Sequence, residues 1–492
     1  MIEEKDLYIP ESPQDECGVF GIYANDKEVD CVLETYKALY ALQHRGQESA
    51  GIVVNSGGEM KCLKNVGTVS EVFSAEELDE LPKGSIAVGH VCYSPGKRLL
   101  PEATQPLLMR YIKGSLALAH NGALTNVAQL HKKLEQGGAI FQSSSNAELI
   151  AYVIASLRLN YPTIEETVVN AMHELEGAYS LVLTSPSMLI GVRDPNGFRP
   201  LCIGKKGSSY MISSESCAFD SLGAEFIRDV EPGEVVVIDE NGIRSFKDNC
   251  GGKSSLCLFE YVYVARPDSV IDGVSVYMAR QEAGRILAKE HPVEADMVCG
   301  VPDSGLSAAL GYSIESGIPY GIALIKNKYI GRTFAKRKIS ERENVLKIRL
   351  NVLKAAVEGK RIIIIDDSIV HGATCAYIVK LLKNAGAKEV HLRISSPPFM
   401  WPCYYGTDIP SKEELIACNY TIEEIGRISG ADSIGFLPAK YLPEMLFNKD
   451  CGYCDACFTG DYPAETTEKM LAGKERGGMN YEKENQCVGK KG

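Results

Sequence analysis

Two adjacent carboxylates, Asp366 and Asp367, stand where a protein could hold a sugar diphosphate. They follow the apolar run 362–365, whose four isoleucines predict a buried strand. A short loop containing Gly372 comes next, and then a helical pattern that Gly386 is placed to end. Ligands of open α/β sheets bind at the carboxyl ends of strands, and a helix N-terminus attracts phosphate. The acid pair can therefore hold ribose hydroxyls or a hydrated Mg²⁺, with an acidic strand end that binds nothing as the alternative.

The stretch from Arg361 to Gly386 resembles the loop with which phosphoribosyltransferases bind phosphoribosyl pyrophosphate (PRPP). An earlier segment, 301–305, resembles the one that faces the pyrophosphate and metal in that family. His371 and Ala373 depart from the family, which usually has arginine and threonine there. The resemblance implies that Mg²⁺ binds to Ser304, Asp366 and Asp367, and that PRPP contacts Asp366, Asp367, Ser368, Gly372 and Thr374.

Basic residues gather between 326 and 349 in an otherwise acidic chain. This stretch resembles the flexible loop that closes over PRPP, and the resemblance implies contacts from Lys326, Arg332 and Lys347. Such cations would neutralise the charge that develops on the leaving pyrophosphate. Closure would also exclude water, which otherwise hydrolyses the activated sugar. A solvated basic face is the alternative.

A second set of reactive residues lies near the N-terminus. Cys17 begins a strand, and it is accompanied by the segments 43–48 and 120–122. A single cysteine in a strand is more often part of the core than a nucleophile. The three segments together resemble the glutaminase domain of N-terminal-nucleophile amidotransferases. The resemblance implies that residues 1–16 are a propeptide, that the freed amine of Cys17 is the base for its own thiol, and that Asn121 and Gly122 form the oxyanion hole.

Both halves, in this order along residues 17–463, resemble the glutamine phosphoribosylpyrophosphate amidotransferases. The resemblance implies that PRPP, glutamine and water give 5-phosphoribosylamine, glutamate and pyrophosphate, the first step of de novo purine synthesis. Ammonia would pass internally from the first site to the second. The resemblance also implies a homotetramer that purine nucleotides inhibit.

Cys451, Cys454 and Cys457 lie close together near the end of the chain, at a spacing typical of metal ligands. Thiolates bind zinc or iron–sulfur clusters, and the spacing alone leaves both open. One branch of the family carries a [4Fe–4S] cluster. That branch implies Cys257, Cys403, Cys454 and Cys457 as the ligands, with Cys451 as a spare.

Two positions depart from the family pattern near the implied glutamine site. Cys92 stands where the family has an arginine for the α-carboxylate of glutamine, and Asn146 where it has an aspartate for the α-amino group. Each such charged contact contributes about 1.5–3 kcal/mol. We therefore predict weaker glutamine binding or another donor, ammonia included, unless Arg98 and Glu102 supply the charges. The alternatives are an altered-donor relative and a non-catalytic regulatory iron–sulfur protein that binds PRPP or nucleotides.

Two kinds of fold must position these residues. Residues 17–245 alternate short strands, Gly-rich turns and helical stretches, which predicts an α+β domain with much antiparallel sheet. With the resemblance, this becomes an N-terminal-nucleophile glutaminase domain, with antiparallel sheets layered between helices. One helix is expected over residues 146–157, with Asn146 as its N-cap.

The pattern changes after a polar, Gly-rich linker at 246–256. Over residues 257–470, continuous apolar strands alternate with helices, as in a parallel sheet covered on both faces. One such strand is expected at 320–324. The resemblance makes this an α/β type I phosphoribosyltransferase domain, followed by a polar tail at 471–492.

The composition is that of a globular protein with room for a large core: 492 residues, 45% hydrophobic and 24% charged. A net charge of -12 argues against non-specific nucleic-acid binding, which needs a basic surface. No apolar run approaches the roughly 20 residues that span a bilayer, and the N-terminus lacks the apolar region of a secretory signal. We expect a cytoplasmic enzyme with small-molecule partners, no membrane partner, and mostly buried, reduced cysteines.

Overall fold

The computed structural model describes residues 17–26, 28–93, 103–143, 145–327, 350–407, 409, 411–447 and 452–464. The expected propeptide 1–16 and tail 471–492 lie outside these ranges. So do five residues named above: Arg98, Glu102, Arg332, Lys347 and Cys451. Within the described ranges, no helix is both long enough and apolar enough to cross a membrane.

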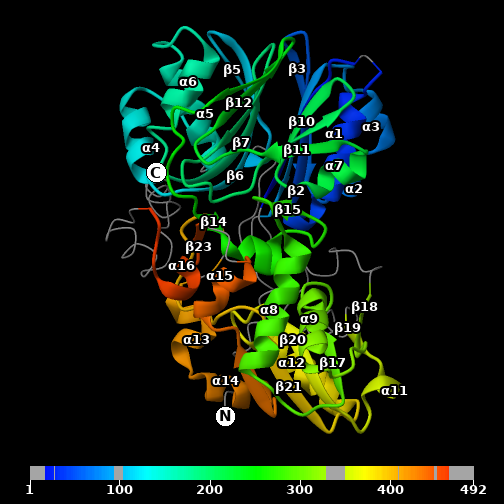
Figure 1. Ribbon diagram of the computed structural model, residues 1–492. Coiled ribbons are helices and arrows are strands. Elements are labelled where there is room, and N and C mark those ends of the chain that lie inside the picture. Colours follow the sequence, from blue (N-terminus) through cyan, green and yellow to red (C-terminus); the bar gives the residue numbers. More distant parts are fainter. Residues whose placement is uncertain are drawn as a thin grey trace, which may run out of the picture.

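The N-terminal half contains two antiparallel sheets that face each other (Figure 1). The seven-stranded sheet has the order β11-β9-β10-β1-β4-β2-β3, and the six-stranded sheet the order β13-β12-β8-β7-β6-β5. The first comprises β1 (Gly18–Tyr23), β2 (Ser49–Ser56), β3 (Glu59–Val66), β4 (Ile86–Cys92), β9 (Cys202–Lys206), β10 (Ser209–Ser213) and β11 (Glu225–Asp229). The second comprises β5 (Leu107–Tyr111), β6 (Gly114–Leu124), β7 (Gly177–Thr184), β8 (Leu189–Arg193), β12 (Val235–Asp239) and β13 (Gly242–Phe246).

Helices cover the outer faces of both sheets, which gives four layers (Figure 1). Along β1, Phe20 and Ile22 pack toward the helices, whereas Val19 faces the second sheet, because successive side chains of a strand point to opposite faces. The layered glutaminase fold is thus confirmed. The helices are α1 (Cys31–Ala41), α2 (Val69–Val72), α3 (Ala75–Asp79) and α7 (Cys217–Leu222) on the first sheet, and α4 (Val127–Gln136), α5 (Asn146–Leu157) and α6 (Ile164–Ala171) on the second.

Helix α5 has the predicted bounds, but its N-cap is a different residue. Ser145 holds that position, and its hydroxyl accepts a hydrogen bond from the backbone N–H of Ala147 at 3.1 Å. Asn146 is the first helical residue and is half-buried. The prediction of Asn146 as the cap was therefore wrong by one position.

The C-terminal half is built on a parallel sheet of order β17-β20-β21-β22. The strands are β17 (Met297–Gly300), β20 (Arg361–Asp366), β21 (Glu389–Ile394) and β22 (Ser433–Phe436). Ile363 and Ile365 pack toward α8 (Val276–Glu290) and α9 (Leu306–Ser316). Ile362 and Ile364 face α12 (Ala373–Asn384) and α14 (Ile422–Ser429). This burial on both faces explains the continuous apolar run and confirms the α/β prediction.

The expected strand at 320–324 is largely absent. Tyr320 makes a single parallel bridge with Val298, and the chain then leaves the sheet at Gly321, where the side chain of Met297 packs against the backbone. The next strand is β18 (Leu324–Lys326), which pairs with β19 (Leu350–Val352) instead of the main sheet.

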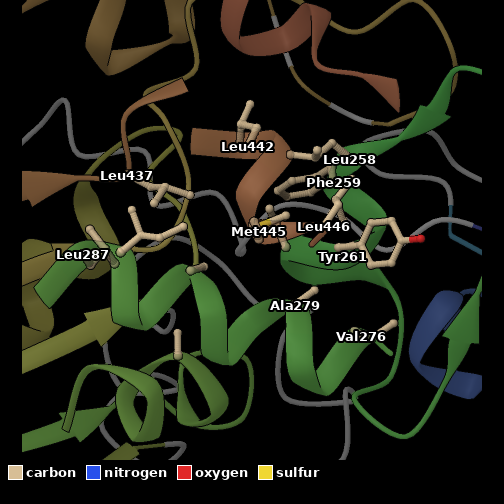
Figure 2. Close-up of a cluster of buried hydrophobic side chains, with 14 of the residues drawn as sticks. Leu258, Phe259, Tyr261, Val276, Ala279, Leu287, Leu437, Leu442, Met445 and Leu446 are labelled. Atoms are coloured by element: carbon tan, nitrogen blue, oxygen red, sulfur yellow. The ribbon is translucent and has the colours of Figure 1, made fainter. Parts of the chain in front are cut away.

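The segment after β14 (Leu256–Cys257) packs against the second half in a cluster of buried apolar side chains (Figure 2). Leu258, Phe259 and Tyr261 pack against α8 and against α15 (Leu442–Met445). The same segment forms a π-helical turn, Glu260–Val264, that brings Glu260 toward the N-terminal half. The remaining short elements are β15 (Val270–Ile271), β16 (Val274–Ser275), α11 (Lys354–Val357), α13 (Ile416–Asn419), β23 (Tyr453–Cys454) and α16 (Ala456–Thr459).

Candidate active site

The thiol of Cys17 lies at the entrance of β1, against a second thiol. Its Sγ is 3.3 Å from the Sγ of Cys92, which ends the neighbouring strand β4. The hydrogen bond with Cys92, aided by His90, holds the pKa of Cys17 well below its ordinary value although burial opposes the shift. The same hydrogen bond, together with burial, raises the pKa of Cys92. Cys17 is therefore the more acidic thiol of the pair, and the thiolate is the nucleophilic form of a cysteine.

Asn121 and Gly122 lie side by side on β6. Asn121 is only 1% exposed, and its amide nitrogen has no hydrogen-bond partner among the described residues. Gly122 has φ +131°, and a Cβ there would lie 2.2 Å from the carbonyl oxygen of Ala178. A buried donor without a partner is uncommon in native proteins, and it suits a site where a negative charge develops.

Two histidines connect the facing sheets beside the thiol. The Nε2 of His90, on β4, is 3.1 Å from the carbonyl oxygen of His120, on β6. The backbone N–H of His120 donates to Oε1 of Gln105 at 2.7 Å. Burial lowers the pKa of His120 to about 4, so its ring is neutral near pH 7. The strand ends that carry Cys17 and Asn121 are thus fixed relative to each other.

The acid pair of the second half lies where the sequence predicted, at the carboxyl end of β20. The hydroxyls of Ser304 and Ser368 donate to the two carboxylate oxygens of Asp367. The backbone N–H of Asp367 donates to Oδ1 of Asp366 at 3.0 Å. Burial raises the pKa of both acids, and for Asp366 the neighbouring carboxylate adds to the shift. Such a pair is suited to a cation or to hydroxyl donors, which would stabilise its charged form.

The predicted turn between β20 and α12 depends on Gly372. Its φ is +84°, and a Cβ there would lie 2.4 Å from Cδ1 of Ile416. Thr374 follows in the first turn of α12, and Gly386, with φ +95°, lies just past the helix end as predicted. His371 is turned toward the rest of the protein, with Nδ1 3.0 Å from the carbonyl oxygen of Glu414, and burial lowers its pKa.

Lys326 is the one predicted PRPP-binding cation that the structure describes. Its Nζ donates to Oδ2 of Asp303 at 2.8 Å, which brings it to the segment that also holds Ser304. It ends β18, opposite Leu350 of β19. Arg332 and Lys347 lie outside the described ranges.

Four cysteines converge on one cavity. Cys257 and Cys454 are direct neighbours in the parallel pair of β14 and β23, and Cys457 lies on α16. Burial and the thiols of Cys257, Cys403 and Cys454 raise the pKa of Cys457. Among the described residues, no three histidines, cysteines or acids approach closely enough for a single metal ion. The cavity is lined by Phe198, Cys257, Cys403, Tyr405, Thr407, Ile409, Cys454, Ala456, Cys457 and Tyr462.

Sequence reasoning missed a buried ionic network between the two halves. Arg45 is fully buried, and its guanidinium donates to Glu215 and, at 2.9 and 2.7 Å, to both oxygens of Glu260. Its Nε also donates to the carbonyl oxygen of Cys17 at 3.2 Å. Burial opposes the shift, but His44 and Arg45 hold the pKa of Glu215 below its usual range. The one available signal was Glu260 itself, an acid within the apolar run 256–264.

A second contact between the halves involves two glycines. A Cβ at Gly406, whose φ is +109°, would lie 2.9 Å from the carbonyl carbon of Gly122. Arg199 fixes the same segment by donating to the carbonyl oxygen of Tyr405 at 2.7 Å and to the hydroxyl of Thr407 at 3.1 Å. The backbone beside the cysteine cavity therefore packs directly on the glycine next to Asn121.

Comparison with known proteins covers both halves. A model described as a glutamine amidotransferase domain matches residues 96–221, and one described as a phosphoribosyl transferase domain matches residues 279–395. The amidophosphoribosyltransferase of Methanocaldococcus jannaschii is 46% identical, over 93% of this chain and 100% of that one. The amidophosphoribosyltransferase of Bacillus subtilis is also 46% identical, over 92% of this chain and 94% of that one.

The chain belongs to the amidophosphoribosyltransferase family. Two solved structures agree. One, glutamine PRPP amidotransferase from B. subtilis complexed with ADP and GMP, has a TM-score of 0.86 at 46% identity and covers 92% of this chain and 98% of that one. The other, described as the allosteric regulatory enzyme of purine biosynthesis, has a TM-score of 0.87 at 45% identity and covers 92% and 97%.

Amidophosphoribosyltransferases are glycosyltransferases, and this chain has their activity: PRPP, glutamine and water give 5-phosphoribosylamine, glutamate and pyrophosphate in purine biosynthesis. The altered-donor and non-catalytic alternatives are not favoured, because relatives with this activity match almost the whole chain.

Proposed function

We propose that the glutaminase half-reaction takes place at Cys17 once residues 1–16 have been removed. The freed α-amine takes the thiol proton, and the thiolate attacks the carboxamide carbon of glutamine to form a γ-glutamyl thioester and release ammonia. Water then hydrolyses the thioester to glutamate. The side-chain amide of Asn121 and the N–H of Gly122 stabilise the oxyanion that forms in each step. The observation that carries this proposal is the buried Asn121 amide, which has no partner among the described residues.

In the second half, ammonia attacks C1 of PRPP and pyrophosphate leaves. We assign Asp366 and Asp367 to the ribose hydroxyls and, with Ser304, to Mg²⁺, which when bound neutralises pyrophosphate charge. The pKa values of this buried acid pair are raised, and a bound cation such as Mg²⁺ fits these groups because it would stabilise their charged form. Phosphate oxygens are bound by the turn before α12, through Ser368, Gly372 and Thr374. Lys326, Arg332 and Lys347 cover the pyrophosphate.

We further propose that the cysteine cavity holds a [4Fe–4S] cluster bound by Cys257, Cys403, Cys454 and Cys457. The donor chemistry supports this proposal, since four soft sulfur ligands line an otherwise largely apolar and aromatic cavity. A cluster also separates its ligands more widely than a zinc ion does. Iron and sulfide analysis of anaerobically purified protein tests the assignment. We expect a broad visible absorption that Cys454→Ala abolishes and that the matched change Cys62→Ala, on edge strand β3, leaves intact.

For the assembly, we propose a cytoplasmic homotetramer that purine nucleotides inhibit. A relative solved with ADP and GMP supports nucleotide binding. We place the glutaminase domain at residues 17–245, the linker at 246–256 and the phosphoribosyltransferase domain at 257–470.

The decisive experiment compares glutamine and ammonia as donors for pyrophosphate release from PRPP with Mg²⁺. We expect Cys17→Ala to lose the glutamine-dependent rate and keep the ammonia-dependent rate, with Cys62→Ala as the control that keeps both. Intact mass should show a chain that begins at Cys17. A mature chain that still begins at Met1, with full glutamine-dependent activity, would contradict the proposed nucleophile.

A further inference from the structure

The partner of the nucleophile is another thiol, placed by the strand register. Gly18 lies opposite Val91 in the antiparallel pair of β1 and β4, so one step further along Cys17 lies opposite Cys92. Side chains directly opposite each other in such a pair share one face of the sheet. The 3.3 Å between the two sulfur atoms follows from this register.

This register places the two residues close enough for a disulfide. Opposite residues of antiparallel strands have Cα atoms about 4.5–5.5 Å apart, within the range that a disulfide bridges. Both residues are half-buried, so neither is enclosed in the core. By contrast, Cys202 and Cys217 lie inside the domain and are fully covered.

The two thiols also differ in acidity, as attacking and resolving thiols do. Cys92 lowers the pKa of Cys17 and has its own pKa raised in return. Peroxides react with thiolates, so we expect Cys17, the more acidic thiol, to be oxidised first with the thiol of Cys92 beside it.

We propose that Cys92 is a resolving cysteine and that Cys17 and Cys92 form a reversible disulfide that switches off the glutaminase. The inference rests on the proposed role of Cys17 as nucleophile. The Cys17 thiolate attacks one oxygen of hydrogen peroxide, the O–O bond breaks, the other oxygen leaves as hydroxide, and Cys17 becomes a sulfenic acid. The sulfur of Cys92 then attacks that of Cys17, the S–O bond breaks, and water leaves with the Cys92 proton. A dithiol reduces the disulfide with two electrons and restores both thiols.

The disulfide has two consequences for the enzyme. It blocks thioester formation while leaving the PRPP site untouched, so ammonia-dependent synthesis continues. It also keeps Cys17 from reaching the sulfinic and sulfonic states, which dithiols do not reverse.

Peptide mapping of the mature enzyme tests the proposal directly. Anaerobically purified protein is treated with stoichiometric hydrogen peroxide, alkylated and digested. We expect a cross-linked peptide pair containing Cys17 and Cys92 that disappears with dithiothreitol. In parallel, the glutamine-dependent rate should be lost and then recovered with dithiothreitol, while the ammonia-dependent rate is retained. Mapping does not depend on activity, so a failed disulfide is distinguishable from a wrong nucleophile.

Cys92→Ser provides the second test, each variant being compared with itself before and after peroxide. We expect its glutamine-dependent rate to be lost without recovery, with Cys17 found as sulfinic or sulfonic acid. Cys62→Ser, the matched control on β3, should recover like the wild type. The proposal is overturned if oxidised wild type lacks the Cys17–Cys92 peptide pair, or if Cys92→Ser recovers as fully as the wild type.

Discussion

At the scale of single residues, the chemistry depends on a buried donor, the side-chain amide of Asn121. The amide of Asn121 is buried, and in the described part of the chain nothing accepts from it. Leaving a buried donor unsatisfied costs about 1–3 kcal/mol, so the fold keeps it at the expense of stability. An oxyanion that forms at this position would recover that cost in the transition state.

Replacing Asn121 with aspartate should therefore separate the two half-reactions. The change keeps the shape of the side chain but puts a carboxylate where a donor is needed. We expect glutamine-dependent kcat to fall about 10²–10³-fold, the typical effect of losing one oxyanion donor. The ammonia-dependent rate should stay within twofold. Steady-state kinetics with both donors measures this, with Asn160→Asp on the exposed surface as the control.

At the scale of elements, the turn from β20 into α12 is the clearest case of a sequence that specifies local structure. The four isoleucines predicted a strand buried on both faces, and Gly372 and Gly386 predicted where the helix begins and ends; all three were confirmed. Each of these predictions depends on nearby residues alone, because a run of apolar residues indicates burial and a glycine indicates positive φ at its own position. The strand expected at 320–324 failed for a nonlocal reason, since Met297 packs where the chain turns away.

Gly372→Ala tests this turn. The substitution places a Cβ against Ile416 and forces a left-handed conformation that costs about 1–2 kcal/mol for a residue with a side chain. We expect a raised KM for PRPP and a lower urea midpoint.

Gly317→Ala is the matched control, because Gly317 also has positive φ but open space around it. It should lower the free energy of unfolding only by the cost of the left-handed conformation, and it should leave the KM for PRPP unchanged. Equal effects of the two substitutions on KM would show that the turn does not position PRPP.

The candidate site was only partly predictable for the same physical reason. Cys17, Asn121 and the acid pair belong to short segments whose residue types suggest chemistry on their own. The contact of Arg45 with Glu260 joins residues that are 215 positions apart in the sequence. No periodicity or spacing in the sequence indicates this contact. The contact between Cys17 and Cys92 required the strand register, which the sequence leaves undetermined until the sheet is known.

At the scale of the whole molecule, Arg45 joins the two halves through a buried ionic network with Glu215 and Glu260. Removing one partner of a buried ionic network leaves the others uncompensated and costs about 3–5 kcal/mol. We expect Arg45→Ala to lower Tm clearly and to reduce the glutamine-dependent rate more than the ammonia-dependent rate, because Arg45 also binds the backbone of Cys17. Calorimetry and kinetics with both donors measure the two effects.

The control is Lys247→Ala, which removes an exposed ion pair with Glu231. Exposed pairs contribute little, so its Tm should match that of the wild type. If both substitutions lower Tm equally, the network does not hold the halves together.

The contact of Gly406 with Gly122 has a consequence for how this enzyme can change over generations. One glycine lies in the ammonia-producing half and the other beside the cysteine cavity, yet neither has room for a methyl group. A chimaera that joins halves of two relatives would therefore keep this contact only if its second half brings glycine at position 406. Either half can then change elsewhere on its own, while the exchange of whole halves is limited by the fit at this contact.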